Sequence, residues 1–252
     1  MIPADIFNRV ARRRQRGRML NCDPDARWLL RHMSEDIVER LDAVRCKFSR
    51  ALILGSDLGS LREWLSERGI SSIVADPSPA IARSEHGVAC DEDRLPFADH
   101  SFDLIIAIGT LGTVTDLPGA LILIRRALKK DGLFLGTMMG VGSLPALRSS
   151  LDDPVAHQAV ARFHPQVDVR SVGDLLARAG FLLPVAENEA ISARYRTLDR
   201  LITDLRANGL ANVLTKRYPL TRCKLSQARK KFAKANVEQF SIITLTGWGQ
   251  SS

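Results

Sequence analysis

The chain lacks several features that would assign it to a special class. No run of apolar residues approaches the roughly 20 that a helix needs to cross a bilayer. The four cysteines are scattered without a CxxC pair, which is typical of a reducing compartment and predicts neither a disulfide framework nor a zinc site. The five histidines form no ligand cluster, and the nearest useful pair, His157 and His164, lacks the carboxylate spacing of known metal sites. We therefore expect no metal.

What is present is typical of a soluble globular protein. Hydrophobic residues make up 45% of the chain and charged residues 25%. A length of 252 residues suffices for one large domain or two small ones. The sequence contains no internal repeat and no low-complexity linker, so a single domain with additions is the simplest interpretation.

The positive charge is unevenly distributed and gives a net charge of +8. Two basic clusters account for it: Arg9, Arg12, Arg13, Arg14, Arg16 and Arg18, and then Lys216, Arg217, Arg222, Lys224, Arg229, Lys230, Lys231 and Lys234. Such clusters attract RNA, an acidic carrier protein or a membrane surface, or else form a solvated face. Because no RNA-binding signature accompanies them, nucleic acid is not the expected partner.

The N-terminal arginines also resemble a mitochondrial presequence. However, the stretch is short, contains Asp5 and is poor in serine. We therefore expect a permanent part of a cytoplasmic protein that offers a basic helix to an acidic or protein acceptor. The oligomeric state stays open.

The hydrophobic pattern changes near residue 50. Residues 1–49 are predicted to be a helical cap, because apolar residues between Asp25 and Leu41 recur close to every 3.6 positions. Residues 50–252 are predicted to form an α/β domain with a helical insertion at about 190–236. Short apolar runs alternate there with helical stretches, which indicates a mostly parallel, seven-stranded sheet covered by helices on both faces.

Expected strands cover residues 51–54, 72–75, 87–89, 102–108, 133–138, 181–185 and 240–246. Expected helices cover residues 60–68, 78–84, 117–128, 172–179, 198–208 and 225–234. Ser60 and Glu63 have the spacing of a capping box, Gly69 suits a helix C-terminus, and Asp131–Gly132 suits a turn before a strand.

Four loops at the carboxyl ends of the expected strands are the candidate cofactor site, because ligands of open α/β sheets bind there. They contain Gly55, Ser56, Asp57 and Gly59, then Asp76 and Pro77, then Asp91 and Glu92, and finally Ile108 and Gly109. Glycines let a ligand approach the backbone, and a carboxylate at residue 76 can accept hydrogen bonds from both ribose hydroxyls. A carboxylate at residue 91 or 92 can accept from an adenine amino group. Taken singly, each feature also fits a turn or a solvated surface.

The segment "CDEDRLPFADHSFDLIIAIGTLGTVTDLPGALILIRRALKKDGLFLGTM" resembles the class I S-adenosylmethionine-dependent methyltransferases. Outside this core, "FNRVARRRQRGRM", "SLPALRSSL", "VGDLLARAGF", "LITDLRANGLANVL" and "LTGWG" resemble two branches. One methylates malonyl-acyl-carrier protein in biotin synthesis. The other, which residues 5–249 resemble slightly more, comprises complex I assembly factors whose proposed reaction is arginine hydroxylation. The resemblance implies a Rossmann-like fold and S-adenosylmethionine as cofactor.

The chain departs from that family at two loops. The family pattern close to LDLGxGxG has an acidic residue where this chain has Ile53, and a glycine where it has Asp57. Asp57 can repel the methionine carboxylate of the cofactor, turn away, or meet its ammonium group in place of the missing carboxylate. Gly112 and Thr113 stand where relatives often have an aromatic pair.

The expected function is methyl transfer to a carrier-bound acid, a small molecule or a protein side chain. No catalytic general base is identified, and an ionised carboxylate acceptor needs none. Tyr195 with Arg196 is a candidate for facing the pocket. The alternative is a complex I assembly factor that binds a partner protein with little or no methyl transfer.

Overall fold

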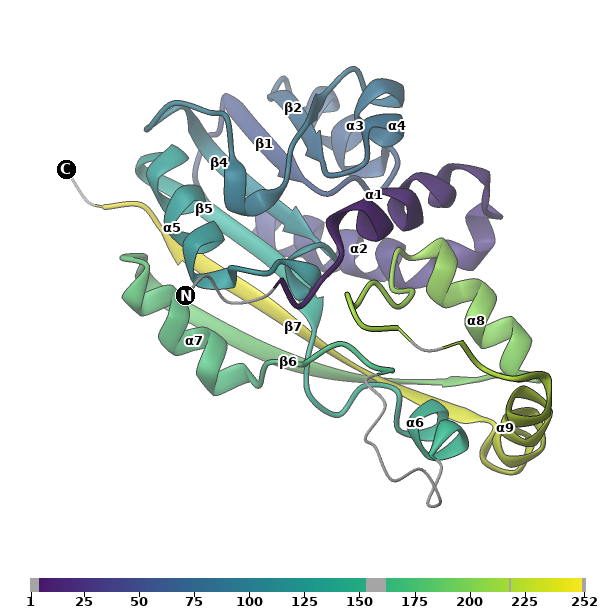
Figure 1. Cartoon of the computed structure of the whole chain (residues 1–252). Coiled ribbons are helices and arrows are strands. Elements are labelled where there is room, and N and C mark those ends of the chain that lie inside the picture. Colours follow the sequence, from purple (N-terminus) through teal and green to yellow (C-terminus); the bar gives the residue numbers. More distant parts are fainter. Residues whose placement is uncertain (1–4, 153–161, 218, 251–252) are drawn as a thin grey trace.

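A seven-stranded sheet runs through the centre of the molecule (Figure 1). The structure, a computed structural model, describes residues 5–152, 162–217 and 219–250. The strand order is β3-β2-β1-β4-β5-β7-β6, with β7 antiparallel to both of its neighbours and the other pairs parallel. This confirms the mostly parallel, seven-stranded α/β sheet expected from the sequence.

The strands are β1 (Arg50–Leu54), β2 (Ser71–Asp76), β3 (Val88–Ala89), β4 (Phe102–Ile108), β5 (Leu128–Met139), β6 (Leu182–Arg194) and β7 (Val237–Trp248). The helices are α1 (Arg9–Arg18), α2 (Trp28–Ala43), α3 (Ser60–Glu67), α4 (Pro79–Ser84), α5 (Leu117–Ala127), α6 (Pro145–Leu151), α7 (Val169–Arg178), α8 (Leu198–Ala207) and α9 (Arg222–Ala235). No helix in these ranges is long and apolar enough to span a membrane.

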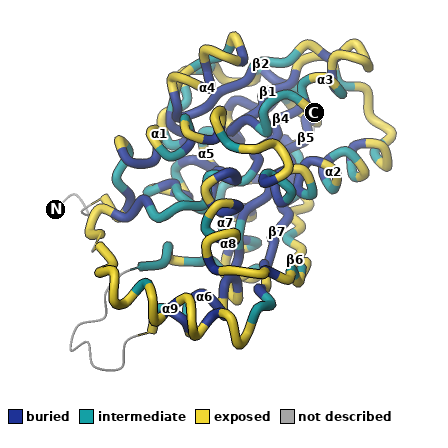
Figure 2. The backbone as a smooth tube through the Cα atoms, turned by 90° about the vertical axis from the view of Figure 1, so that its right-hand side faces the viewer, coloured by how far each residue is buried: buried dark blue, intermediate teal, exposed yellow. Residues whose placement is uncertain are grey.

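Alternation along the strands divides the core into two layers. Leu52 and Leu54 of β1 pack with α5 and α7, whereas Ile53 between them packs with α2, α3 and α8. The central strands β1 and β4 are buried on both faces, as a parallel sheet requires (Figure 2). Ile53, at the position where the family has a carboxylate, is therefore a core residue with 1% exposure.

Several sequence predictions were wrong in detail. The capping box is absent: Gly59 is the N-cap of α3, and Ser60 is its first helical residue. Asp131 has a positive φ of 54°, but it lies inside β5 rather than in a turn before it. Residues 190–194 belong to β6, so the helices between β6 and β7 begin only at Leu198. Gly69 follows α3 with a φ of 71°, as a C-terminal glycine should.

Helix α1 lies across the carboxyl ends of the parallel strands (Figure 1). Asn8 caps it by accepting a hydrogen bond from the Ala11 N–H at 2.8 Å. Just before α1, Phe7 pairs with Leu214 in an antiparallel bridge. These contacts fix α1 between the strand-end loops and the segment that follows α8. The division into an N-terminal cap and a separate domain stays a prediction.

Candidate functional site

The loop after β1 packs directly against the loop after β4. Gly55 has a φ of 76° and donates a backbone hydrogen bond to Ala75 at 2.8 Å. A Cβ atom on Gly55 would lie 2.8 Å from the Ile108 carbonyl oxygen and 2.9 Å from the Thr110 Cβ. Both the left-handed backbone and the close approach therefore require glycine at this position.

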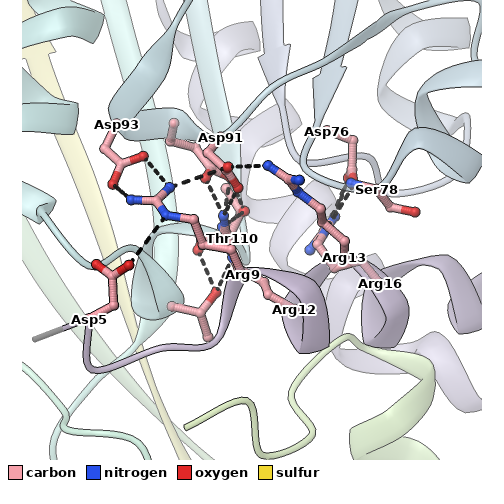
Figure 3. A network of polar contacts seen from close by, with 12 residues as sticks. Asp5, Arg9, Arg12, Arg13, Arg16, Asp76, Ser78, Asp91, Asp93 and Thr110 are labelled. Carbon is pink, nitrogen blue, oxygen red and sulfur yellow. Dashed lines mark hydrogen bonds and ion pairs between the residues drawn. The ribbon is translucent and has the colours of Figure 1, made fainter. Parts of the chain in front are cut away.

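Asp76 ends β2 and is completely buried. Its carboxylate accepts backbone N–H groups from Ser56 at 3.1 Å and Ser78 at 2.7 Å. The same oxygens accept Nε of Arg16 at 2.9 Å and its Nη2 at 2.7 Å. This carboxylate has the place expected of a ribose acceptor, but a guanidinium of the same chain holds it (Figure 3).

The acidic segment after β3 is held in the same way by α1. Both Nη atoms of Arg12 reach the Glu92 carboxylate, at 2.7 and 2.9 Å, and Nη2 also donates to Thr110 Oγ1 at 2.8 Å. Nη2 of Arg13 donates to Asp91 at 2.7 Å. At the N-terminal end of α1, Arg9 donates two hydrogen bonds to Asp93, at 2.7 and 2.6 Å (Figure 3).

The four paired arginines form a stripe, here called the α1 arginine stripe: Arg9, Arg12, Arg13 and Arg16. Their spacing of three and four places them on one face of a helix. The sequence analysis treated these arginines as a patch for an external partner. Their helical periodicity could have indicated partners within the chain itself, because the carboxylates that they pair with lie on consecutive strand-end loops.

Burial makes these ion pairs strong constraints. Arg12, Arg16 and Asp91 are each 3% exposed, and Glu92 is 1% exposed. Burial opposes the charged form of Arg12, but the charge of Glu92 and its hydrogen bonds outweigh this and raise the pKa above its ordinary value. Removing one partner from a buried pair costs about 3–5 kcal/mol, because the other charge is left uncompensated. The stripe therefore holds α1 on the site.

Asp57 turns toward α3. Its carboxylate accepts the Leu61 N–H at 3.0 Å and the hydroxyl groups of Ser34 and Ser60, while Gly59 donates from 3.3 Å. Of the three orientations open from the sequence, this geometry fits a carboxylate that turns away from the ligand. Asp57 stabilises the N-terminus of α3 in place of the expected capping box.

We expect Asp57→Gly to lower the free energy of unfolding by about 1–2 kcal/mol, because α3 loses its capping acceptor. Affinity for S-adenosylmethionine should not change. Denaturant titration and calorimetry measure the two quantities, and Asp57→Asn, which keeps one acceptor oxygen, is the matched control. A large change in affinity without a loss of stability would contradict this role.

Comparison with known proteins agrees with this geometry. A model described as "Methyltransferase domain" matches residues 52–136. The malonyl-[acyl-carrier protein] O-methyltransferase of Methylovorus sp. is 30% identical, with 85% of this chain and 78% of that protein aligned. The chain belongs to the class I S-adenosylmethionine-dependent methyltransferase family. The mitochondrial arginine-hydroxylase NDUFAF5 of Homo sapiens is also 30% identical, over 86% of this chain but only 66% of its own length.

The crystal structure of YcgJ protein from Bacillus subtilis shares the fold. Its TM-score is 0.59 at 16% sequence identity, and 88% of this chain and all of that chain are covered. The sheet is thus the Rossmann-like sheet of the methyltransferases. As a member of this family, the chain has S-adenosylmethionine as its cofactor.

The residues expected at the cofactor site fit that group in position. Gly55 and Ser56 form a close-packed turn, Asp76 ends β2, and Asp91 with Glu92 lies one strand further along. The α1 arginine stripe spans Asp76 and Asp91, so the structure brings these carboxylates together. Pro77 follows Asp76 and is buried, and Ile108 and Gly109 border Gly55. Their contacts with a cofactor stay a prediction.

Tyr195 and the histidines are the remaining candidates named from the sequence. Tyr195 is 4% exposed and packs near Phe240, with ring centroids 6.5 Å apart, so it belongs to the core rather than to the pocket. Burial raises its pKa above the ordinary value. Within the described residues no group of three His, Cys, Asp or Glu side chains has the geometry of a metal site, and His157 lies outside them.

A large cavity adjoins the loop after β4 on the side of α6 and α8. Its volume is about 680 Å³, and Gly109, Gly112 and Thr113 border it. His164 also lines it, and its Nε2 accepts the backbone N–H of Val213 at 3.0 Å. Burial lowers the pKa of His164 to about 4, so its ring is neutral at pH 7.

We predict a pH dependence of stability from His164. The unfolded histidine takes up a proton near pH 6.5 and the folded one only near pH 4. The stability contribution is therefore complete above pH 6.5 and is lost as the pH falls to 4, by up to about 3 kcal/mol. Denaturant titrations of the protein and of His164→Gln across this range test it. Equal slopes for both proteins would contradict the assignment.

Proposed function

We propose that the chain is an enzyme that transfers a methyl group from S-adenosylmethionine to a carboxylate of an acceptor bound beside the strand-end loops. The observation that carries the proposal is the convergence of Gly55, Asp76 and Glu92 on neighbouring strand-end loops. They meet beside the loop after β4, which borders the 680 Å³ cavity. These loops would hold the cofactor, and an acceptor in the cavity beside the loop after β4 would be its neighbour. The relatives that methylate a carrier-bound malonyl group support an acid as acceptor.

The chemistry asks little of the protein beyond positioning. The cofactor supplies an electrophilic methyl group on a sulfonium sulfur. An ionised carboxylate oxygen attacks it in line, so one O–C bond forms as one C–S bond breaks, and the pair of electrons stays on sulfur. No proton moves, which agrees with the absence of a candidate general base from the sequence analysis. Holding the reactants in place supplies most of the rate.

The α1 arginine stripe has to yield for this binding mode. Both oxygens of Asp76 are engaged by Arg16 and by backbone N–H groups, so ribose hydroxyls can bind only when the Arg16 guanidinium moves aside. The cost of separating this buried pair is subtracted from the affinity for the cofactor. We therefore propose that the free protein is closed by α1 and opens on binding.

The same pairs favour a second candidate, an assembly factor that acts on or binds a partner protein with little or no methyl transfer. The carboxylates of Asp76, Asp91 and Glu92 have their hydrogen-bond partners and counter-charges on α1, so they need no cofactor to satisfy them. The relatives named arginine-hydroxylase NDUFAF5 direct this candidate to a role in complex I assembly, with possible arginine hydroxylation. The cytoplasmic location inferred from the sequence stays part of the proposal.

Calorimetry with S-adenosylmethionine and S-adenosylhomocysteine separates the two candidates. The enzyme candidate predicts binding of both, with heat that disappears in Asp76→Asn. Glu187→Gln is a suitable control, because Glu187 is an exposed carboxylate on β6, outside the site. Absence of binding, in the protein and in a variant that lacks Arg16, would reject the enzyme and favour the assembly factor.

A further inference from the structure

The 680 Å³ cavity beside the strand-end loops has an apolar wall. Aliphatic side chains of α6 and α8 contribute to it: Leu147, Leu151, Leu198, Ile202 and Leu205. Leu147, Leu198 and Leu205 are themselves less than 10% exposed, so this wall continues the hydrophobic core. A cavity of this size and lining suits an organic ligand with a sizeable apolar body.

The charged side chains that line the cavity are all positive. Arg148, Arg162, Arg206 and Arg217 border the cavity, and none of the described lining residues is an aspartate or glutamate. Within the described part of the chain no salt bridge engages any of these four guanidinium groups. The lining is therefore complementary to an anion and opposes a cation.

One of these arginines has an unmet hydrogen-bonding need. Nη1 of Arg162 is buried and has no hydrogen-bond partner. Buried donors are almost always paired, because an unpaired donor has lost its hydrogen bond with water and gained none in the protein. Arg148 is held nearby, since its guanidinium stacks 4.4 Å from the ring centroid of Phe163, the residue after Arg162. Both arginines lie where an anionic group would satisfy them.

We propose that this cavity binds an amphipathic organic acid, in which a hydrophobic chain lies along the α6–α8 wall and a carboxylate is held by Arg162. The inference rests on the proposed function, for which it names the class of acceptor. It separates this chain from enzymes that act on short polar acids, because a small dicarboxylate group would leave the leucine wall uncovered. A polar or cationic ligand does not match the lining.

Dodecanoate is a defined probe for this proposal. In calorimetric titrations below its micelle concentration, dodecanoate should bind at least tenfold more tightly than hexanoate, which lacks most of the chain. It should also bind at least tenfold more tightly than dodecan-1-ol, which lacks the charge. Equal affinity for the acid and the alcohol, or for the long and the short acid, would overturn the proposal.

Two variants locate the binding. Arg162→Gln should weaken dodecanoate about tenfold and leave dodecan-1-ol unchanged. Ile202→Trp, which fills the cavity from a position only partly buried, should weaken both. Arg170→Gln on α7, an exposed arginine outside the lining, should change neither. Melting curves identify a misfolded variant, and an unchanged affinity in both folded test variants would overturn the site.

The readouts also separate this inference from the proposed function. S-adenosylmethionine binding is measured on the same samples. Cofactor binding without dodecanoate binding would reject the acceptor class and leave the methyltransferase proposal standing. Dodecanoate binding that is localised by the variants, without cofactor binding, would support the amphipathic-acid site and reject methyl transfer.

Discussion

Arg16→Ala is expected to bind S-adenosylmethionine at least tenfold more tightly than the unmodified protein. Arg16 donates hydrogen bonds from Nε and Nη2 to the buried Asp76 carboxylate, which is the proposed acceptor for the ribose hydroxyls. Without Arg16, cofactor binding no longer has to separate an ion pair. The ribose hydroxyls then supply hydrogen bonds to the Asp76 carboxylate, which would otherwise be buried without a counter-charge. Tenfold corresponds to about 1.4 kcal/mol, a modest part of the cost of a broken buried pair.

The same variant should lose stability without ligand. Its melting temperature should fall, and added S-adenosylmethionine should raise it more than in the unmodified protein, as mass action requires. Arg14→Ala is the matched control, because Arg14 is exposed on the same helix. Weaker cofactor binding in Arg16→Ala would mean that Arg16 holds the cofactor itself, and the account of a closed free protein would fail.

Gly55→Ala should have the largest effect on both stability and cofactor binding. A Cβ atom would meet the Ile108 carbonyl oxygen at 2.8 Å, and the φ of 76° is strained for alanine. We expect a loss of about 2–5 kcal/mol, from the left-handed backbone and from overpacking. The displaced loop also separates the backbone of Ser56 from Asp76, so calorimetry should show no cofactor binding.

Gly112→Ala is the control for this substitution. Gly112 lies on the loop after β4, against which the Gly55 loop packs, but a Cβ on Gly112 has no atom within 4 Å. Its stability should stay within about 0.5 kcal/mol of the unmodified protein, as for most substitutions that disturb no contact. Equal losses for the two alanine variants would show that the close packing at Gly55 is not what the loop depends on.

The sequence predicted the sheet well because its strands carry clear signals. The run Phe102–Ile108 is apolar apart from Asp103, and the structure begins and ends β4 at those residues. Alternation at the C-terminus likewise indicated β7, although its antiparallel direction has no local signal. The short α6 was missed, since Pro145–Leu151 offers only two turns of periodicity.

The site was harder to predict because its key contacts join distant segments. Asp76 and Arg16 are 60 residues apart, and the local sequence around either residue does not predict that they pair. The orientation of Asp57 stayed open for a related reason: its contact with Ser34 depends on how α2 packs over the loop. Loop positions and residue types could be predicted, whereas the choice of partner depends on tertiary packing.

The most direct test of the account is a crystal structure of the full chain with S-adenosylhomocysteine. The account predicts ribose hydroxyl groups on the Asp76 carboxylate, the adenine beside Asp91 and Glu92, and the Arg16 guanidinium displaced from its present hydrogen bonds. A ligand bound elsewhere, with Arg16 still joined to Asp76, would contradict it.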